Sequence, residues 1–200
     1  MRILPSIPSL LLALAACAQL PCSTASATPV TLHLTRPPSS VSFGVTSPSP
    51  ALTMNGSFKD FSGELLLDPR GLEESKISLA LNLASAQLPP EQMLQAIFLQ
   101  TTLARFQDQS GTFTSTSIEP LSEGQFIVTG NTTWANKTKE TSVPIEVLKL
   151  SPSRAEIKFL LDGTVRPQDV QPNVAKIAPG ISGSRGWAKA TLVFSPRAAR

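Results

Sequence analysis

The feature that most constrains the fold is a two-residue alternation of apolar side chains, which recurs along most of the chain. In Ile77–Leu83 it places four large apolar side chains on one face of an extended segment. The pattern predicts strands that each bury one face. Further segments with this pattern, or with a run of β-prone Thr and Ser, are Val41–Val45, Leu52–Phe58, Leu65–Leu67, Thr112–Ile118, Gln125–Trp134, Thr141–Leu148, Arg154–Val165 and Trp187–Phe194.

These segments amount to about nine or ten strands, which in so short a chain indicates an antiparallel sandwich or barrel. One helix interrupts them. Pro89 and Pro90 precede the segment Met93–Phe106, whose apolar residues recur at helical spacing. We expect this helix to pack on the sheet or to plug an opening of it. Its predicted apolar stripe is Ala96, Leu99, Leu103 and Phe106, broadened by Met93 and Ile97.

Composition argues against catalysis, metal binding and nucleic-acid binding. The two cysteines, Cys17 and Cys22, lie near the N-terminus, and His33 is the single histidine. The predicted domain therefore has no thiolate for a metal site or a nucleophile, and we expect neither a metal nor a cofactor. No Gly-x-Ser-x-Gly elbow or glycine-rich phosphate motif occurs. The net charge is +3 and the basic residues are scattered, which does not favour nucleic acid. We predict that the protein is not an enzyme.

The N-terminus reads as an export signal. Arg2 precedes the apolar stretch Ile3–Ala16, which is shorter than the roughly 20 residues that span a bilayer. Leu14–Cys17 resembles a lipobox, in which Cys17 is acylated and anchors the protein to a membrane. Ala25–Ala27 is a competing cleavage site, and we favour the lipobox because it ends the apolar run directly. We expect residues 1–27 to be signal peptide and tether, residues 28–200 to be the β-barrel domain, and the protein to be periplasmic.

Three segments, in order, carry a resemblance to a known family. They are Phe58–Leu65 followed by Leu67–Pro69, then Gly111–Thr116, and last Phe126–Thr133 running on to Pro144. Together they resemble the YceI-like family of lipid- and polyisoprenoid-binding proteins over roughly Thr31 to Pro196. The helical region is more apolar than the family pattern, which marks a divergent member.

The resemblance implies an all-β fold, a lipocalin-like antiparallel barrel of about eight strands with one helix. It implies an exported carrier for an apolar, lipid-like ligand such as a polyisoprenoid or an acyl chain. The alternative is a structural or interaction lipoprotein whose barrel is solid. An outer-membrane barrel is disfavoured because the chain has no tyrosine and only two tryptophans for aromatic girdles. The inward residues that either line a cavity or fill a core are Phe43, Leu79, Leu81, Phe126, Val128, Ile157 and Phe159.

Overall fold

The computed structural model describes residues 28–48, 53–104, 110–134, 137–164 and 184–197. Three parts of the sequence predictions lie outside these residues: the lipobox with Cys17, the alternative cleavage site Ala25–Ala27, and Phe106 of the predicted helical stripe.

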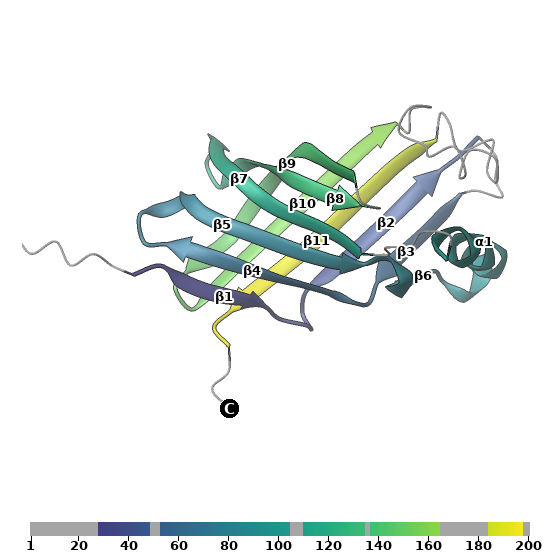
Figure 1. Ribbon diagram of the computed structural model, residues 1–200, viewed down its shortest axis with the longest axis horizontal. Helices are drawn as coiled ribbons and strands as arrows, with labels where there is room; N and C mark the ends of the chain where they lie inside the picture. The colour runs from purple at the N-terminus through teal and green to yellow at the C-terminus, as the bar shows by residue number, and fades with distance from the viewer. Residues whose placement is uncertain (1–27, 49–52, 105–109, 135–136, 165–183, 198–200) are drawn as a thin grey trace, which may run out of the picture.

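The described part of the chain forms eleven strands, one α-helix and two short 3-10 helices (Figure 1). The helix α1 spans Met93–Leu103, and the 3-10 helices are η2 (Leu83–Ser85) and η3 (Pro90–Gln92). The strands are β1 (Val30–Leu34), β2 (Ser40–Thr46), β3 (Met54–Phe58), β4 (Phe61–Asp68), β5 (Gly71–Asn82), β6 (Ala86–Gln87), β7 (Ser110–Ser122), β8 (Gln125–Trp134), β9 (Lys137–Ser151), β10 (Arg154–Thr164) and β11 (Arg185–Ser195).

Eight of these strands close into an antiparallel barrel in the order β1-β4-β5-β7-β8-β9-β10-β11. The ring closes where β1 pairs with the last residues of β11, His33 opposite Ser195 and Leu34 opposite Phe194. The earlier part of the same β11 edge pairs with β2, and β3 and β6 continue the wall from there. Pairing of β1 with β11 removes the free edges that an open sheet would present at this point. The predicted eight-stranded antiparallel barrel with one helix is therefore confirmed.

One half of the barrel is packed solid, and we call it the packed end. Its centre is formed by Leu32, Leu65 and Phe194, all with 0% of their surface exposed. Alternation along β1, β4 and β11 brings these side chains together inside the ring. The remaining members of this core are Leu67, Leu72, Ile77, Ile118, Val128, Ile145, Ala155, Ile157, Ala190 and Leu192.

Two glycines of the family-like segments lie where neighbouring strands approach too closely for any side chain. A Cβ at Gly63 would lie 2.6 Å from Leu79 Cδ2 and 2.9 Å from the Ser78 carbonyl oxygen. At Gly130 it would overlap the Thr114 carbonyl oxygen. Real Cβ contacts are longer, so these positions require glycine for packing.

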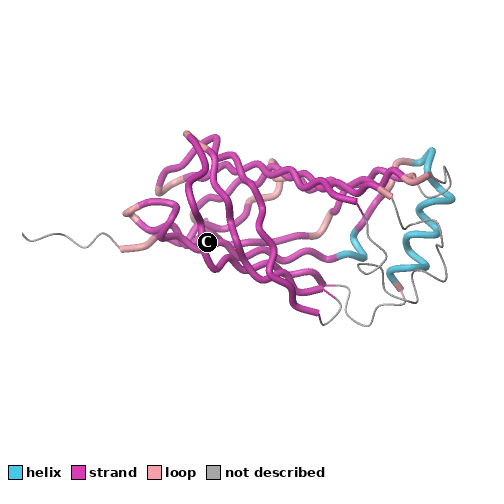
Figure 2. The backbone as a smooth tube through the Cα atoms, turned by 90° about the horizontal axis from the view of Figure 1, so that it is seen from above, coloured by secondary structure: helices cyan, strands magenta, loops and turns pink. Residues whose placement is uncertain are grey.

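Helix α1 lies at the other end of the barrel, beside β3 and β6 (Figures 1 and 2). We call this the open end. Leu103 packs with Leu83 and Ala86 in a second small core. The Gln100 side-chain amide donates a hydrogen bond of 3.1 Å to the Ala86 carbonyl oxygen. These contacts fix the C-terminal half of the helix against the rim.

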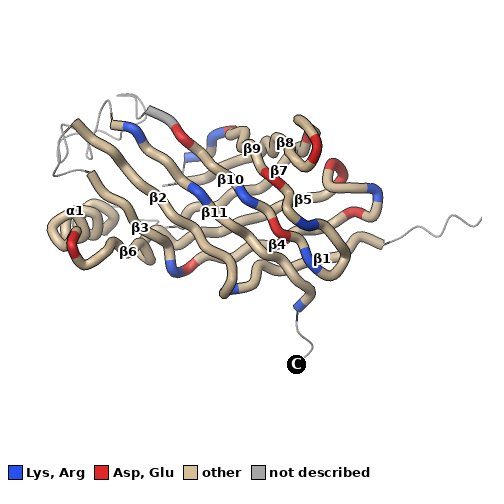
Figure 3. The backbone as a smooth tube through the Cα atoms, turned by 180° about the vertical axis from the view of Figure 1, so that it is seen from behind, with Lys and Arg blue, Asp and Glu red and all other residues tan. Residues whose placement is uncertain are grey.

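The predicted helix is confirmed over Met93–Leu103, but its predicted apolar stripe is partly wrong. Leu99 and Leu103 face the barrel as expected, whereas Met93 and Ile97 are 65% and 58% exposed. The last turns of the helix pack on the barrel, whereas the first turns expose Met93 and Ile97 to solvent. No charged residue occurs within α1, while the charged residues of the barrel are spread over its strands and turns (Figure 3).

Candidate functional site

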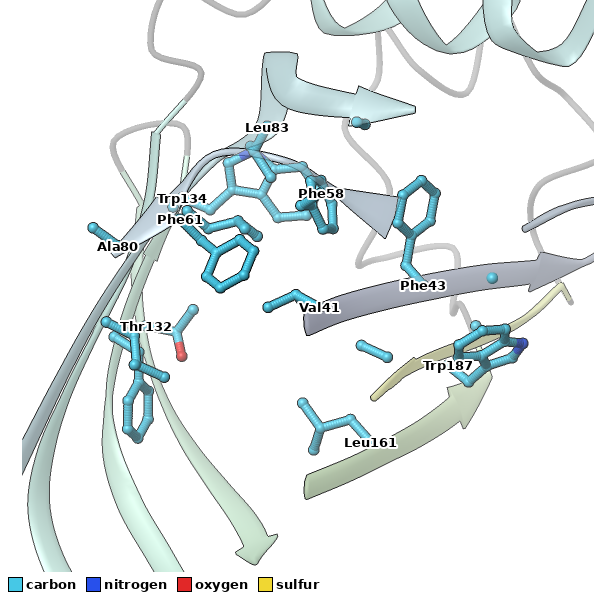
Figure 4. Close-up of a pocket in the computed structure, with 18 of the residues that line it drawn as sticks. Val41, Phe43, Phe58, Phe61, Ala80, Leu83, Thr132, Trp134, Leu161 and Trp187 are labelled. Atoms are coloured by element: carbon cyan, nitrogen blue, oxygen red, sulfur yellow. The ribbon is translucent and has the colours of Figure 1, made fainter. Parts of the chain in front are cut away.

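Between the packed end and helix α1 the barrel holds a cavity of about 750 Å³. This volume falls within the roughly 300–1,000 Å³ that is usual for small-molecule sites. Every described strand except β9 contributes to its wall, and α1 covers part of its end. Figure 4 shows side chains from several of these strands converging on the space. The barrel is thus solid at one end and hollow at the other.

Aromatic rings form much of the cavity wall. The rings of Phe43 on β2 and Phe58 on β3 lie 4.7 Å apart between centroids. Phe61 and Trp134 also line the cavity (Figure 4). Rings in this arrangement present large rigid apolar surfaces, which suits a ligand that is held by contact area rather than by hydrogen bonds.

Helix α1 contributes the cover of the cavity through Phe98, Leu99, Thr102 and Leu103. The Thr102 hydroxyl donates a hydrogen bond of 2.8 Å to the Phe98 carbonyl oxygen of its own helix. Its polar group is therefore already satisfied, and the side chain presents its methyl group as readily as an apolar residue would.

A set of hydrogen bonds fixes the turn between β3 and β4 at the rim of the cavity. Asp60 accepts a hydrogen bond from the Arg36 guanidinium at 3.1 Å and one from the Asn82 side-chain amide at 3.2 Å. The Ser85 hydroxyl accepts from the backbone N–H groups of Lys59 and Asp60. Because Phe58 and Phe61 flank this turn, the network sets the position of two wall residues.

Asp162 is the one titratable residue among the described residues that line the cavity. Arg185 Nε donates to its Oδ1 at 2.9 Å. This hydrogen bond and the carboxylate charge raise the pKa of the Arg185 guanidinium. The carboxylate is therefore already paired and is poorly placed to act as a general acid or base.

Four of the seven residues predicted to line a cavity lie on its wall. They are Phe43, Leu79, Leu81 and Phe159. The other three do not reach it: Val128 and Ile157 belong to the core of the packed end, and Phe126 packs against that core. The division follows position along the strands, since the same inward face serves a core at one end and a cavity at the other. Contact of the four wall residues with a ligand stays a prediction.

Several wall residues were not identified in the sequence. Val41, Phe58 and Leu161 sit on the inward face of strands whose alternation is visible, so the same pattern could have indicated them. Trp134 and Thr132 lie at the end of β8, where no sequence signal shows that the strand borders a hollow rather than a core.

The described residues hold no further site of an obvious chemical kind. They contain no group of three or more His, Cys, Asp or Glu side chains arranged to bind a metal ion. His33 lies on the outside of the barrel, with Nδ1 3.2 Å from Glu64 Oε1. Among the helices of the described residues, none has the length and apolar character needed to cross a membrane.

A comparison with known protein families shows which family the barrel belongs to. The model of the YceI-like domain matches residues 33–181, most of the chain. The chain belongs to the YceI-like family. All three family-like segments contribute to the cavity of this YceI-like barrel: Phe58 and Phe61 come from the first, Phe113 from the second and Thr132 from the third.

Individual relatives agree with this membership. A UPF0312 protein of Ectopseudomonas mendocina (strain ymp) is 34% identical over 84 residues, which is 42% of this chain and 44% of that relative's length. BcnA of Burkholderia cenocepacia has a similar fold, with a TM-score of 0.60 and 19% identity over 78% of this chain and 95% of that one.

Two further solved structures share the fold. A polyisoprenoid binding domain from Saccharophagus degradans, implicated in plant cell wall breakdown, gives a TM-score of 0.55 at 12% identity over 84% of this chain and 99% of its own. The YCEI protein of Campylobacter jejuni gives 0.51 at 20% identity, over 72% of this chain and 85% of its own.

Proposed function

We propose that this YceI-like protein binds and carries an elongated apolar molecule, such as a polyisoprenoid or an acyl chain, inside the cavity. The observation that carries the proposal is the cavity of about 750 Å³ whose described lining is almost wholly apolar. A related fold belongs to a polyisoprenoid binding domain of Saccharophagus degradans, which supports this ligand class.

Apolar burial would supply the binding free energy. Each methylene removed from water contributes about 0.8 kcal/mol before the ordering of the chain is subtracted. An apolar wall distinguishes chains that differ by one methylene by only about 1–3 kcal/mol. We therefore expect selectivity for length and shape rather than for fine chemical detail.

The alternative of a solid structural barrel is less well supported. Leu79, Leu81, Phe113 and Phe159 point inward yet are only partly buried, because their inner surfaces border open space. A barrel evolved only for stability would gain by filling that space, since voids lower the free energy of unfolding. An enzymatic function is disfavoured because the one titratable group of the described lining, Asp162, is paired with Arg185.

Two neighbouring leucines on β10 provide a matched test. Leu161 lines the cavity, whereas Leu160 is on the outer face and 60% exposed. We expect Leu161→Asp to weaken binding of a fluorescent isoprenoid by about tenfold or more, because the ligand would bury an unpaired carboxylate. Leu160→Asp should bind as the wild type does.

Binding would be measured by fluorescence titration, with competition by unlabelled isoprenoid and thermal melts to establish that both variants fold. Native mass spectrometry of detergent-free protein from its own host would identify the natural ligand. The proposal is wrong if the wild type shows no saturable, competable binding and carries no lipid.

We also propose that the protein acts outside the cytoplasm. The support is the leader, with Arg2, the apolar stretch Ile3–Ala16 and the lipobox-like Leu14–Cys17. A carrier held at a membrane surface by an acylated Cys17 would stay close to a store of lipid ligands.

A further inference from the structure

The barrel wall is interrupted between β9 and β10 at the level of the cavity. The ladder between these strands ends at the pair Ile145–Phe159. Beyond it, β9 runs on to Lys137 paired only with β8, and β10 runs on to Thr164 paired only with β11. The first β9 residue past the ladder is Pro144, which has no backbone N–H to donate.

This interruption, which we call the seam, opens into the cavity. The cavity wall includes Thr132 and Trp134 of β8 on one side and Leu161 and Asp162 of β10 on the other. No residue of β9, the strand between them, lines the cavity. Trp134 is 49% exposed although it contributes to the wall. In the part of the chain that the structure describes, the seam is therefore a lateral opening of the cavity.

Two lysines of β9 lie along one edge of the seam. Lys137 pairs with Trp134 and Lys139 pairs with Thr132. Side chains directly opposite in an antiparallel pair leave the sheet on the same face, so both lysines lie on the face that carries the cavity wall. Both are exposed, and neither forms an ion pair with another described residue.

The other charges near the seam do not neutralise these lysines. Asp162 lies on β10, at the opposite edge of the seam, and accepts a hydrogen bond from Arg185. Glu140 directly follows Lys139 in sequence, so it leaves β9 on the opposite face, as its partner Asn131 does on β8. Among the described residues, the opening of this apolar cavity therefore carries two positive charges that no negative charge compensates.

We propose that the ligand is amphipathic, with an anionic head that Lys137 and Lys139 bind at the seam while its apolar chain fills the cavity. This inference rests on the proposed function and adds the chemistry of the head: a phosphate or a carboxylate in place of an alcohol. The competing explanation is that the lysines only protect an open strand edge from pairing with another chain.

Matched probes separate the head from the chain. The full-length protein would be titrated, by displacement of one fluorescent lipid, with geranylgeranyl phosphate and geranylgeraniol, and then with palmitate and hexadecanol. Charge-assisted hydrogen bonds predict that the wild type binds at least one of the anions about tenfold or more tightly than its alcohol. The pair that shows the preference tells whether phosphate or carboxylate is the natural head.

The test variant is Lys137→Met combined with Lys139→Met. The control is Lys149→Met with Lys158→Met, which removes two exposed lysines from the part where β9 and β10 are paired. We expect the test variant to lose the preference for the anion while its affinity for the alcohol stays unchanged, and the control to behave as the wild type. High salt should also reduce the wild-type preference.

The assignment of the lysines would be overturned if the wild type bound anion and alcohol equally, or if the test variant kept the preference for the anion. Either result would leave the proposed carrier function standing. Binding of neither the anions nor the alcohols by the wild type would overturn both.

Discussion

Replacing Leu65 and Leu81 by alanine, one at a time, compares the packed end with the open end of the barrel. Leu65 on β4 has 0% of its surface exposed and belongs to the solid core. Leu81 on the neighbouring strand β5 is partly buried and lines the cavity. The two changes remove the same atoms from adjacent strands, so any difference reports the surroundings of the side chain.

The structure predicts different losses in the free energy of unfolding. Leu65→Ala should cost about 3 kcal/mol, within the usual range of about 2–5 kcal/mol, because it loses the full transfer free energy and leaves a closed void. Leu81→Ala should cost about 1 kcal/mol, since only part of its surface is removed from water and the space it leaves joins an existing cavity. A difference of about 2 kcal/mol corresponds to roughly 4–8 °C in Tm for a chain of this size.

The assay is urea denaturation of lipid-free protein, followed by circular dichroism, with Tm measured in parallel. Adding the isoprenoid should raise the Tm of Leu65→Ala as much as that of the wild type, and the Tm of Leu81→Ala less, because only Leu81 borders the ligand. If both variants lost about 3 kcal/mol, the cavity would be closed in solution and the reasoning would be refuted.

Three other expectations concern packing, pH and the leader. Gly130→Ala should lower the free energy of unfolding by about 1–3 kcal/mol, because the added methyl group overpacks the site. Gly111→Ala should be tolerated, since a Cβ there meets nothing nearer than 3.8 Å. Equal losses in Tm for the two variants would contradict this reasoning. Hydrogen bonds from Arg70 lower the pKa of Asp68, so Asp68→Asn should lower the Tm at neutral pH. The difference in Tm between the wild type and this variant should vanish as the pH falls through that lowered pKa. A difference that stays constant with pH would argue against a stabilising role for the Asp68 carboxylate. Cys17→Ser should abolish labelling by a clickable fatty acid in a bacterial host and release the protein from the membrane fraction, and unchanged labelling would refute the lipobox.

Much of the barrel could be predicted from strand alternation alone. The bounds predicted for Gln125–Trp134 coincide with β8, and the inward set Ala155, Ile157, Phe159 and Leu161 follows directly from the period of two. Alternation is a local property of the pleated strand, so it can be read without knowing which strands are neighbours. The resemblance to the family added the expectation of a closed barrel with an apolar interior.

The division of that interior into a core and a cavity could not be predicted. Val128 and Ile157 have the same pattern around them as Leu81 and Phe159, yet the first two fill the packed end and the other two line the cavity. What separates them is how far each lies along the barrel from the ring closure of β1 and β11, a distance set by pairings between residues remote in sequence.

The sequence by itself therefore determined which face of each strand points inward and that this face is apolar, because both follow from residue type and a period of two. Only the tertiary structure decided where the barrel closes, where it stays hollow, and that the β9–β10 ladder ends beside Lys137 and Lys139. These features depend on the register between strands that are distant in sequence. That register is set by many contacts between both strands of each pair, so it cannot be inferred from one segment alone.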